Sequence, residues 1–250
     1  MKARTRSLSG ALTAILIIPF VIGLLACIPV PIGDPEKSRV DDEITGIWYV
    51  REGEDAYVNL FEPYDKRTWL VTKIELEIEF DEWCDEPGNE PEGYDEIMAA
   101  LRDLGEDCLG KGDQASYKAW TKTLGDTTFM TWEMKGGLDE DHGFHPLLWL
   151  GYKIEKAGPD EFTLRMINGG HDVFSEFEEN KGYKKMDDEG PPFDPRAFRS
   201  ARRAFERLLK KNADNEEIYS DGDVDPMLHY RIVPDDYDLF IGNVVPDPTD

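Results

Sequence analysis

The chain has 250 residues, with 53 Asp and Glu against 28 Lys and Arg, which gives a formal net charge of −25. Its hydrophobic fraction of 40% is enough for a substantial core in one or two domains. A surface this negative repels polyanions, which excludes nucleic acid as the main partner and argues against broad adhesion to anionic lipid.

Residues 1–26 have the pattern of an export signal. The first six residues contain three cations, Lys2, Arg4 and Arg6. An uncharged apolar stretch follows, from 11 to 26, and this order predicts that the rest of the chain crosses a membrane. The alternative is an uncleaved anchor, because no charge occurs over 8–32, a length that can span a bilayer. Pro19 interrupts that run and favours a cleaved signal.

The apolar stretch ends in Leu24-Leu25-Ala26-Cys27, which resembles the lipobox of bacterial lipoproteins. The resemblance implies a diacylglyceryl group on the Cys27 thiol, cleavage after Ala26 and acylation of the new amino terminus. It also implies a lipid-anchored protein on the extracytoplasmic side of the cell membrane or the outer membrane. Cleavage leaves 224 residues (250 minus 26) and, because three cations and no acids are removed, a net charge of −28.

Residues 27–43 are predicted to be the lipidated cysteine followed by a flexible tether. Pro29, Pro31 and Pro35 favour extended backbone in this segment. At ~3.3 Å per residue, the tether would hold the domain up to ~50 Å from the membrane.

The two remaining cysteines, Cys84 and Cys108, lie in an acidic stretch, 81–113, with 12 acids and two bases. Disulfides persist outside the cytoplasm, so we expect a Cys84–Cys108 bond at the base of an insertion, worth ~3 kcal/mol. A short helix is expected within the insertion, because Ile97, Met98, Leu101 and Leu104 recur at helical spacing. The alternative is two free buried thiols. No zinc site is expected, because no His lies nearby.

Residues 44–233 are predicted to form a mainly β domain. The expected strands are 44–50, 55–61, 68–80, 115–121, 126–135, 147–156, 161–167 and 227–233, with 173–177 as a further candidate. The third strand alternates: Leu70, Ile74, Leu76, Ile78 and Phe80 are expected in the core, and Lys73, Glu75, Glu77 and Glu79 in solvent. Short connections between consecutive strands predict an antiparallel meander, and a curved meander can close into a barrel.

One amphipathic helix is expected near the C-terminus, over 195–211. Asp194 is a good N-cap, and Pro195 suits the first helical position. The helix is the one basic element, with seven cations and one acid. Such a helix could touch anionic headgroups, but the favoured interpretation packs it on the sheet with its cations near carboxylates. Residues 234–250 are expected to form a loosely held acidic tail.

Gly46-Ile47-Trp48 on the first strand resembles the Gly-x-Trp signature of lipocalins and related calycin barrels. The resemblance implies a barrel whose closed end is plugged by Trp48, with the C-terminal helix packed on its wall. The alternative is that Trp48 is an ordinary core aromatic. No Thr-Asp-Tyr motif matches the second signature of that family.

Three further motifs fail as sites. Residues 105–112 nearly spell a phosphate-binding loop, but Gly112 replaces the Ser or Thr that holds magnesium. His142 and His145, beside Asp139, Glu140 and Asp141, fall in a loop interpreted as solvated rather than metal-binding. Residues 221–225 resemble a calcium loop, but Pro226 and Ile232 stand where it needs Gly and Glu.

These patterns predict no catalytic residues, cofactor or metal site, and an enzyme is the third choice. The first hypothesis is a lipoprotein that binds a small apolar ligand in its barrel. Inward-facing candidates to line that site are Met130, Trp132, Met134 and Tyr152. The alternative is a solid core formed by the same residues, with the acidic surface binding a protein partner.

Overall fold

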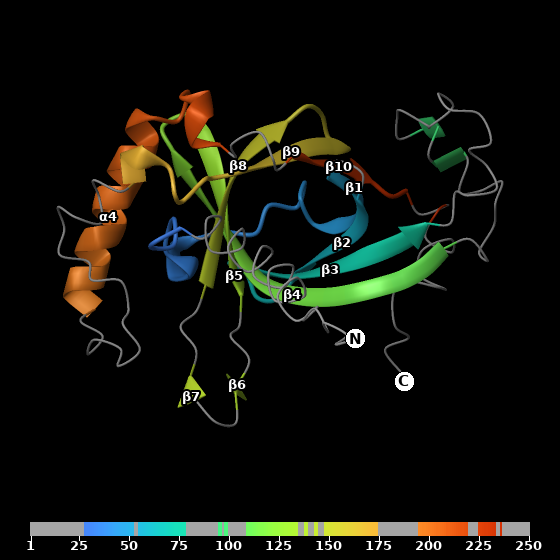
Figure 1. Cartoon of the computed structure of the whole chain (residues 1–250), viewed down its shortest axis with the longest axis horizontal. Coiled ribbons are helices and arrows are strands. Elements are labelled where there is room, and N and C mark those ends of the chain that lie inside the picture. Colours follow the sequence, from blue (N-terminus) through green and yellow to red (C-terminus); the bar gives the residue numbers. More distant parts are fainter. Residues whose placement is uncertain are drawn as a thin grey trace, which may run out of the picture.

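The computed structural model describes residues 28–52, 55–78, 95–96, 98–99, 109–134, 138–139, 143–144, 148–174, 195–219, 225–233 and 236. Eight antiparallel strands close into a barrel in the order β1-β10-β9-β8-β5-β4-β3-β2 (Figure 1). Their bounds are β1 Gly46–Glu52, β2 Asp55–Pro63, β3 Trp69–Ile78, β4 Leu109–Leu124, β5 Thr127–Met134, β8 Leu148–Lys156, β9 Glu161–Met166 and β10 Met227–Arg231.

The barrel is a meander in which each strand pairs with its neighbour along the chain. A two-stranded hairpin, β6 (Leu138–Asp139) and β7 (Gly143–Phe144), lies between β5 and β8 in the sequence. The barrel closes where Trp48 of β1 pairs with Arg231 of β10. The predicted fold class, a mainly β antiparallel barrel with one C-terminal helix, is confirmed.

Two boundaries differ from the predictions. Strand β4 begins at Leu109, and its first residues pair with the end of β3, where Lys111 lies opposite Leu76. The acidic insertion predicted over 81–113 therefore ends before 109. Residues 172–174 form a helical turn instead of the candidate strand.

The prediction for the two faces of β3 was wrong. Lys73 and Glu75 lie opposite Asn59 and Tyr57 of β2, on the face of β3 that points into the barrel. Ile74 and Leu76 point outward, into a second apolar cluster. Besides Ile74 and Leu76 of β3, this cluster contains Met98, Ile232 and the outer side chains of β1 and β2, which are Ile47, Tyr49 and Val58. An alternating strand has an apolar face and a polar face. Because Met98 and Ile232 cover the outside of the barrel here, the apolar face of β3 points outward and its polar face points into the barrel.

One end of the barrel is closed by the chain that precedes β1. Ile44 is buried, and its carbonyl accepts a hydrogen bond from Trp48 Nε1 at 2.7 Å. Thr45 Oγ1 accepts a second bond from Trp69 Nε1 at 3.1 Å. The Arg231 guanidinium lies 4.3 Å from the Trp48 ring. Trp48 is thus buried at the end of the barrel that this segment covers.

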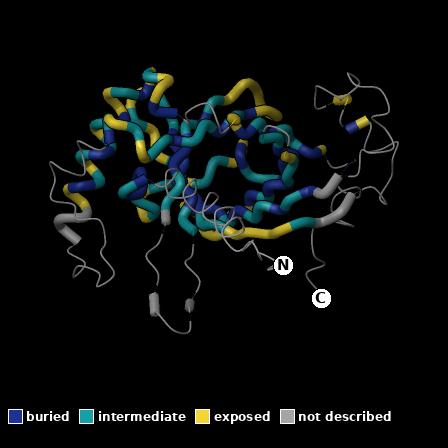
Figure 2. The backbone as a smooth tube through the Cα atoms, viewed as in Figure 1, coloured by how far each residue is buried: buried dark blue, intermediate teal, exposed yellow. Residues whose placement is uncertain are grey.

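Helix α4 (Pro195–Lys211) packs on the outer wall of the barrel, as predicted. Its buried side chains are Ala201, Phe205 and Leu209, and they contact outward-facing residues of the barrel such as Phe129. Buried, intermediate and exposed residues alternate along the described part of the helix (Figure 2), as an amphipathic helix on a barrel wall requires.

The predicted tether over 27–43 was wrong for the described part, because residues 28–33 lie between α4 and the barrel. We call these six residues the strap. Ile28, Val30 and Ile32 are all buried. Ile28 N donates to Trp149 O at 2.9 Å, and Trp120 Nε1 donates to Ile32 O at 2.8 Å. The prolines do extend the backbone. In an extended backbone every second side chain points the same way, so the three apolar residues form one face that is buried.

Helix α4 also holds the strap through polar contacts. Gly33 N donates to Glu206 Oε1 at 3.0 Å, and Arg202 forms an ion pair with Asp34 at 3.1 Å. Gly151 of β8 makes room on the barrel side, because a Cβ there would lie 3.0 Å from Ile28. The strap is therefore part of the packed core between α4 and the barrel wall, and the folded domain includes the chain from Ile28 onward.

Candidate functional site

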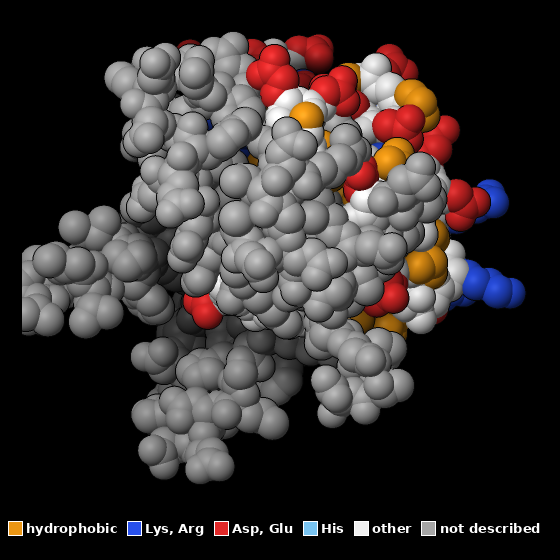
Figure 3. Space-filling view, turned by 90° about the vertical axis from the view of Figure 1, so that its right-hand side faces the viewer, with side chains coloured by type: hydrophobic (Ala, Val, Ile, Leu, Met, Phe, Trp, Pro, Cys, Tyr) orange, Lys and Arg blue, Asp and Glu red, His pale blue; other side chains and the backbone are white. Residues whose placement is uncertain are grey.

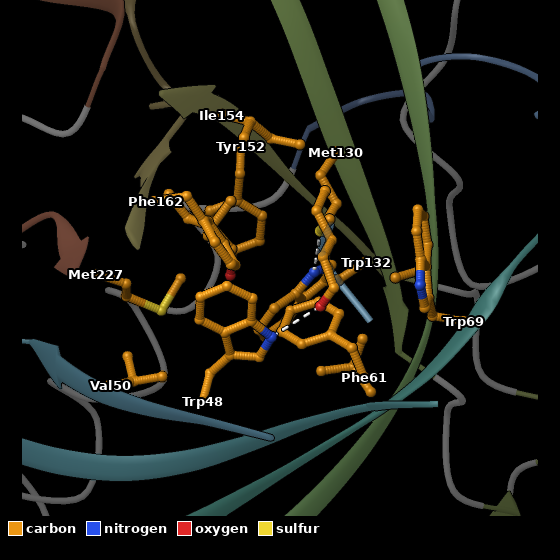
Figure 4. Packing of buried hydrophobic residues seen from close by; sticks show 14 residues of the cluster. Trp48, Val50, Phe61, Trp69, Met130, Trp132, Tyr152, Ile154, Phe162 and Met227 are labelled. Atoms are coloured by element: carbon orange, nitrogen blue, oxygen red, sulfur yellow. Dashed lines mark hydrogen bonds between the residues drawn. The ribbon is translucent and has the colours of Figure 1, made fainter. Parts of the chain in front are cut away.

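The closed half of the barrel interior is packed with aromatic side chains (Figure 4). The rings of Trp48 and Phe162 meet edge to face with centroids 4.6 Å apart. Trp132 lies 5.0 Å from Tyr152 and donates its Nε1–H to the Met130 sulfur at 2.9 Å. These side chains are almost completely buried. This half of the barrel is a solid core.

The other half of the interior ends in a ring of side chains that remain partly exposed. We call this end the mouth. Its inward-facing residues come from seven strands: Glu52, Tyr57, Lys73, Glu75, Tyr117, Met134, Leu150 and Met166. The apolar members of this ring, Tyr117, Met134, Leu150 and Met166, are partly exposed, unlike the side chains of the packed half. The surface of the mouth is therefore partly apolar and partly charged.

An ion pair lies within the mouth. Lys73 Nζ is 3.1 Å from Glu52 Oε2 and 3.6 Å from the centre of the Tyr57 ring. Burial, then the negative charges of Asp55 and Glu52, raises the pKa of Tyr57. The three side chains form a polar group at one side of the mouth, opposite the apolar side from β8 and β9.

A buried polar pair marks the floor of the mouth. Asn59 Nδ2 and His229 Nε2 are 3.0 Å apart, and both residues are fully buried. His229 Nδ1 lies 3.1 Å from Met227 O. Since a carbonyl only accepts, Nδ1 carries the proton and Nε2 accepts from Asn59. Asn59 Oδ1 has no hydrogen-bond partner in the described structure.

The buried environment of His229 keeps its imidazole neutral. Burial away from water lowers its pKa to about 3, against the opposing effect of the Met227 contact, and the charge of Lys73 lowers the pKa further. Its ring stacks on Phe162, with centroids 4.3 Å apart. A neutral imidazole here is a fixed hydrogen-bonding group rather than a proton carrier at neutral pH.

The four predicted lining residues do not share one role. Met130, Trp132 and Tyr152 lie in the packed half, whereas Met134 is half-buried at the mouth. Sequence reasoning missed Asn59, His229 and the Lys73–Glu52 pair. The signal for Lys73 was present, as a charge at every second position of a strand, but it was assigned to the outer face.

Several predicted features lie outside the described residues. These are Cys27, the Cys84–Cys108 pair, the side chains from 139 to 145, most of 221–225 and most of the acidic tail. Among the described side chains, no three His, Cys, Asp or Glu residues gather as metal ligands. No helix in the described part of the chain is long and apolar enough to cross a membrane.

Comparison with known proteins assigns no relative to this chain. No protein-family model, curated protein or solved structure matches it.

Proposed function

We propose that the protein is a lipoprotein anchored through Cys27 on the extracytoplasmic side of a membrane, and that the mouth of its barrel binds a small ligand. The N-terminal cations, the apolar stretch and the Ala26-Cys27 junction support the anchor. The partly exposed inward side chains of the mouth support the binding site.

The observation that carries the binding function is the contrast between the two barrel halves. Trp48, Phe61 and Trp132 fill one half, while Tyr117, Leu150 and Met166 keep exposed surface in the other. A ligand that suits this mouth has a small apolar body. It also has a polar group that replaces water at the Lys73–Glu52 pair.

Native mass spectrometry of protein extracted from membranes in mild detergent tests the binding site. We expect one small molecule per chain. Leu150→Trp fills the mouth and should abolish the bound mass, whereas Tyr64→Trp, at an exposed position of the β2–β3 turn, should retain it. If the wild type carries no small molecule and none of a panel of small apolar compounds binds it, the mouth is not a ligand site. The solid-core interaction protein then replaces this proposal.

The anchor has a separate test. Intact mass spectrometry of the processed wild type should show a chain that begins at Cys27 and carries acyl groups. Cys27→Ser should lose the acyl mass and the processed form. An identical processed, membrane-bound form in this variant would disprove the lipobox.

A further inference from the structure

The outer face of α4 carries cations that nothing in the described structure neutralises. Of its cations, Arg202 pairs with Asp34. Four others are exposed and have no hydrogen-bond or ion-pair partner in the described structure: Arg203, Arg207, Lys210 and Lys211. Their spacing of three and four residues places them along one side of the helix, and we call them the basic stripe.

Helix stability does not account for the basic stripe. Lys210 and Lys211 lie in the last turn, where cations complement the helix dipole. Arg203 and Arg207 lie further inside the helix, and like charges four residues apart repel each other. An anion bound from outside would relieve the repulsion between Arg203 and Arg207.

The apolar face of α4 is not available to that partner. Phe205 and Leu209 are completely buried against the barrel and the strap. The helix therefore cannot insert into a bilayer as an amphipathic anchor, and its exposed side offers charge alone. The matching surface is a layer of anionic groups.

The strap places the predicted lipid next to this helix. Cys27 directly precedes Ile28, whose backbone N is bonded to Trp149 and whose side chain lies in the same cluster as Phe205. Adjacent Cα atoms are 3.8 Å apart, so a lipid on the residue that precedes Ile28 would leave only one residue between the acyl chains and this wall of the barrel.

The described surface on the side away from α4 is mainly acidic. In Figure 3, which looks onto the right-hand side of Figure 1, Asp and Glu side chains predominate among the charged groups of the described surface. Helix α4 lies at the left of Figure 1, on the other side of the barrel. A negative membrane would repel the first side and attract the second.

We propose that the basic stripe of α4 binds the anionic headgroups of the membrane in which Cys27 is anchored, so that this wall of the barrel faces the lipid surface. The proposal rests on the lipid anchor of the proposed function. It predicts an electrostatic contact, screened by salt, in which each cation near the surface strengthens the attraction about fivefold.

The native lysines report the contact. The acylated protein is reconstituted in vesicles of phosphatidylcholine alone or with about a third phosphatidylglycerol. Its lysines are acetylated briefly with a water-soluble reagent and quantified by peptide mass spectrometry. We expect Lys210 and Lys211 to be labelled at least threefold more slowly in the anionic vesicles, and the difference to vanish at about 1 M salt. Lys66, an exposed residue at the closed end of the barrel, should be labelled equally in both.

Matched variants separate the basic stripe from general charge. Arg203→Gln with Arg207→Gln should remove most of the protection, whereas Arg39→Gln with Lys66→Gln removes two exposed charges elsewhere and should leave it intact. Equal labelling of Lys210 in both vesicle types would overturn the inference while leaving the anchor established. Protection that persists in detergent, or in neutral vesicles, would also overturn it and assign the stripe to an acidic protein segment. Absence of acyl mass on Cys27 would instead disprove the anchor itself.

Discussion

His229 couples the stability of the barrel to pH through a single side chain. Its folded pKa is lowered to about 3, whereas an unfolded His titrates near about 6.5. Between these values the unfolded chain binds a proton that the folded chain excludes. The free energy of unfolding therefore falls as the pH drops below about 6.5, at up to about 1.4 kcal/mol per unit.

Urea unfolding at pH 7 and pH 5 checks this effect. The wild type should lose about 2 kcal/mol more between the two pH values than His229→Gln, because exposed carboxylates titrate alike in both proteins. Equal losses would mean that His229 is protonated in the folded barrel.

Gly151 leaves the space that Ile28 occupies. A Cβ at this position would lie 3.0 Å from two Ile28 carbons and 3.1 Å from Ile167, closer than packed atoms normally approach. Gly151→Ala should lower the free energy of unfolding by about 1–3 kcal/mol, although alanine in a strand otherwise costs less backbone entropy than glycine.

Gly158 provides the control for this prediction. Nothing lies within 4 Å of a Cβ built there, so Gly158→Ala should change stability by less than about 0.5 kcal/mol. Unfolding curves that coincide for the two variants would show that the strap yields without cost.

Helix α4 and the strap act as one element on the barrel wall. Phe205 is fully buried, with its ring 5.3 Å from Phe174, in the cluster that also holds the strap residues. Phe205→Ala should cost about 3–5 kcal/mol, because it removes a large side chain from a packed site. Thermal unfolding followed by circular dichroism measures this cost.

Arg203→Ala lies two residues away on the exposed side and should cost less than about 0.5 kcal/mol. A comparable cost for both substitutions would mean that α4 contributes to stability through charge rather than burial.

Much of the element-level description was predictable from the sequence. The helix over 195–211 was found at its observed bounds, because Pro195 and the apolar stripe define it independently of the rest of the fold. The strap was missed because its apolar residues, 28, 30 and 32, alternate with prolines that were interpreted as a linker. The mouth was missed because alternation in β3 identifies two faces but does not say which of them an outer layer covers.

At the scale of the whole molecule, excess negative charge opposes folding. With a net charge of −25, the carboxylates lie closer together in the folded chain than in the unfolded one, so their mutual repulsion is stronger in the folded chain. Raising sodium chloride from about 0.02 M to 0.5 M should therefore raise the Tm by several degrees, since screening shortens from roughly 20 Å to about 4 Å. A Tm that falls with salt would mean that ion pairs such as Lys156–Asp41 outweigh this repulsion.

The strap also sets an order of events in folding. It bonds Ile32 to Thr131, 99 positions further along the chain, and Gly33 to Glu206, 173 positions further. The first of these partners lies about halfway along the chain, and the second lies in α4. The strap therefore cannot complete its contacts before α4 is present. A chain truncated before α4 would leave Ile28, Val30 and Ile32 without the helix that covers them. Exposed apolar residues of this kind are bound by chaperones and cut by proteases, so a docked strap requires the complete helix.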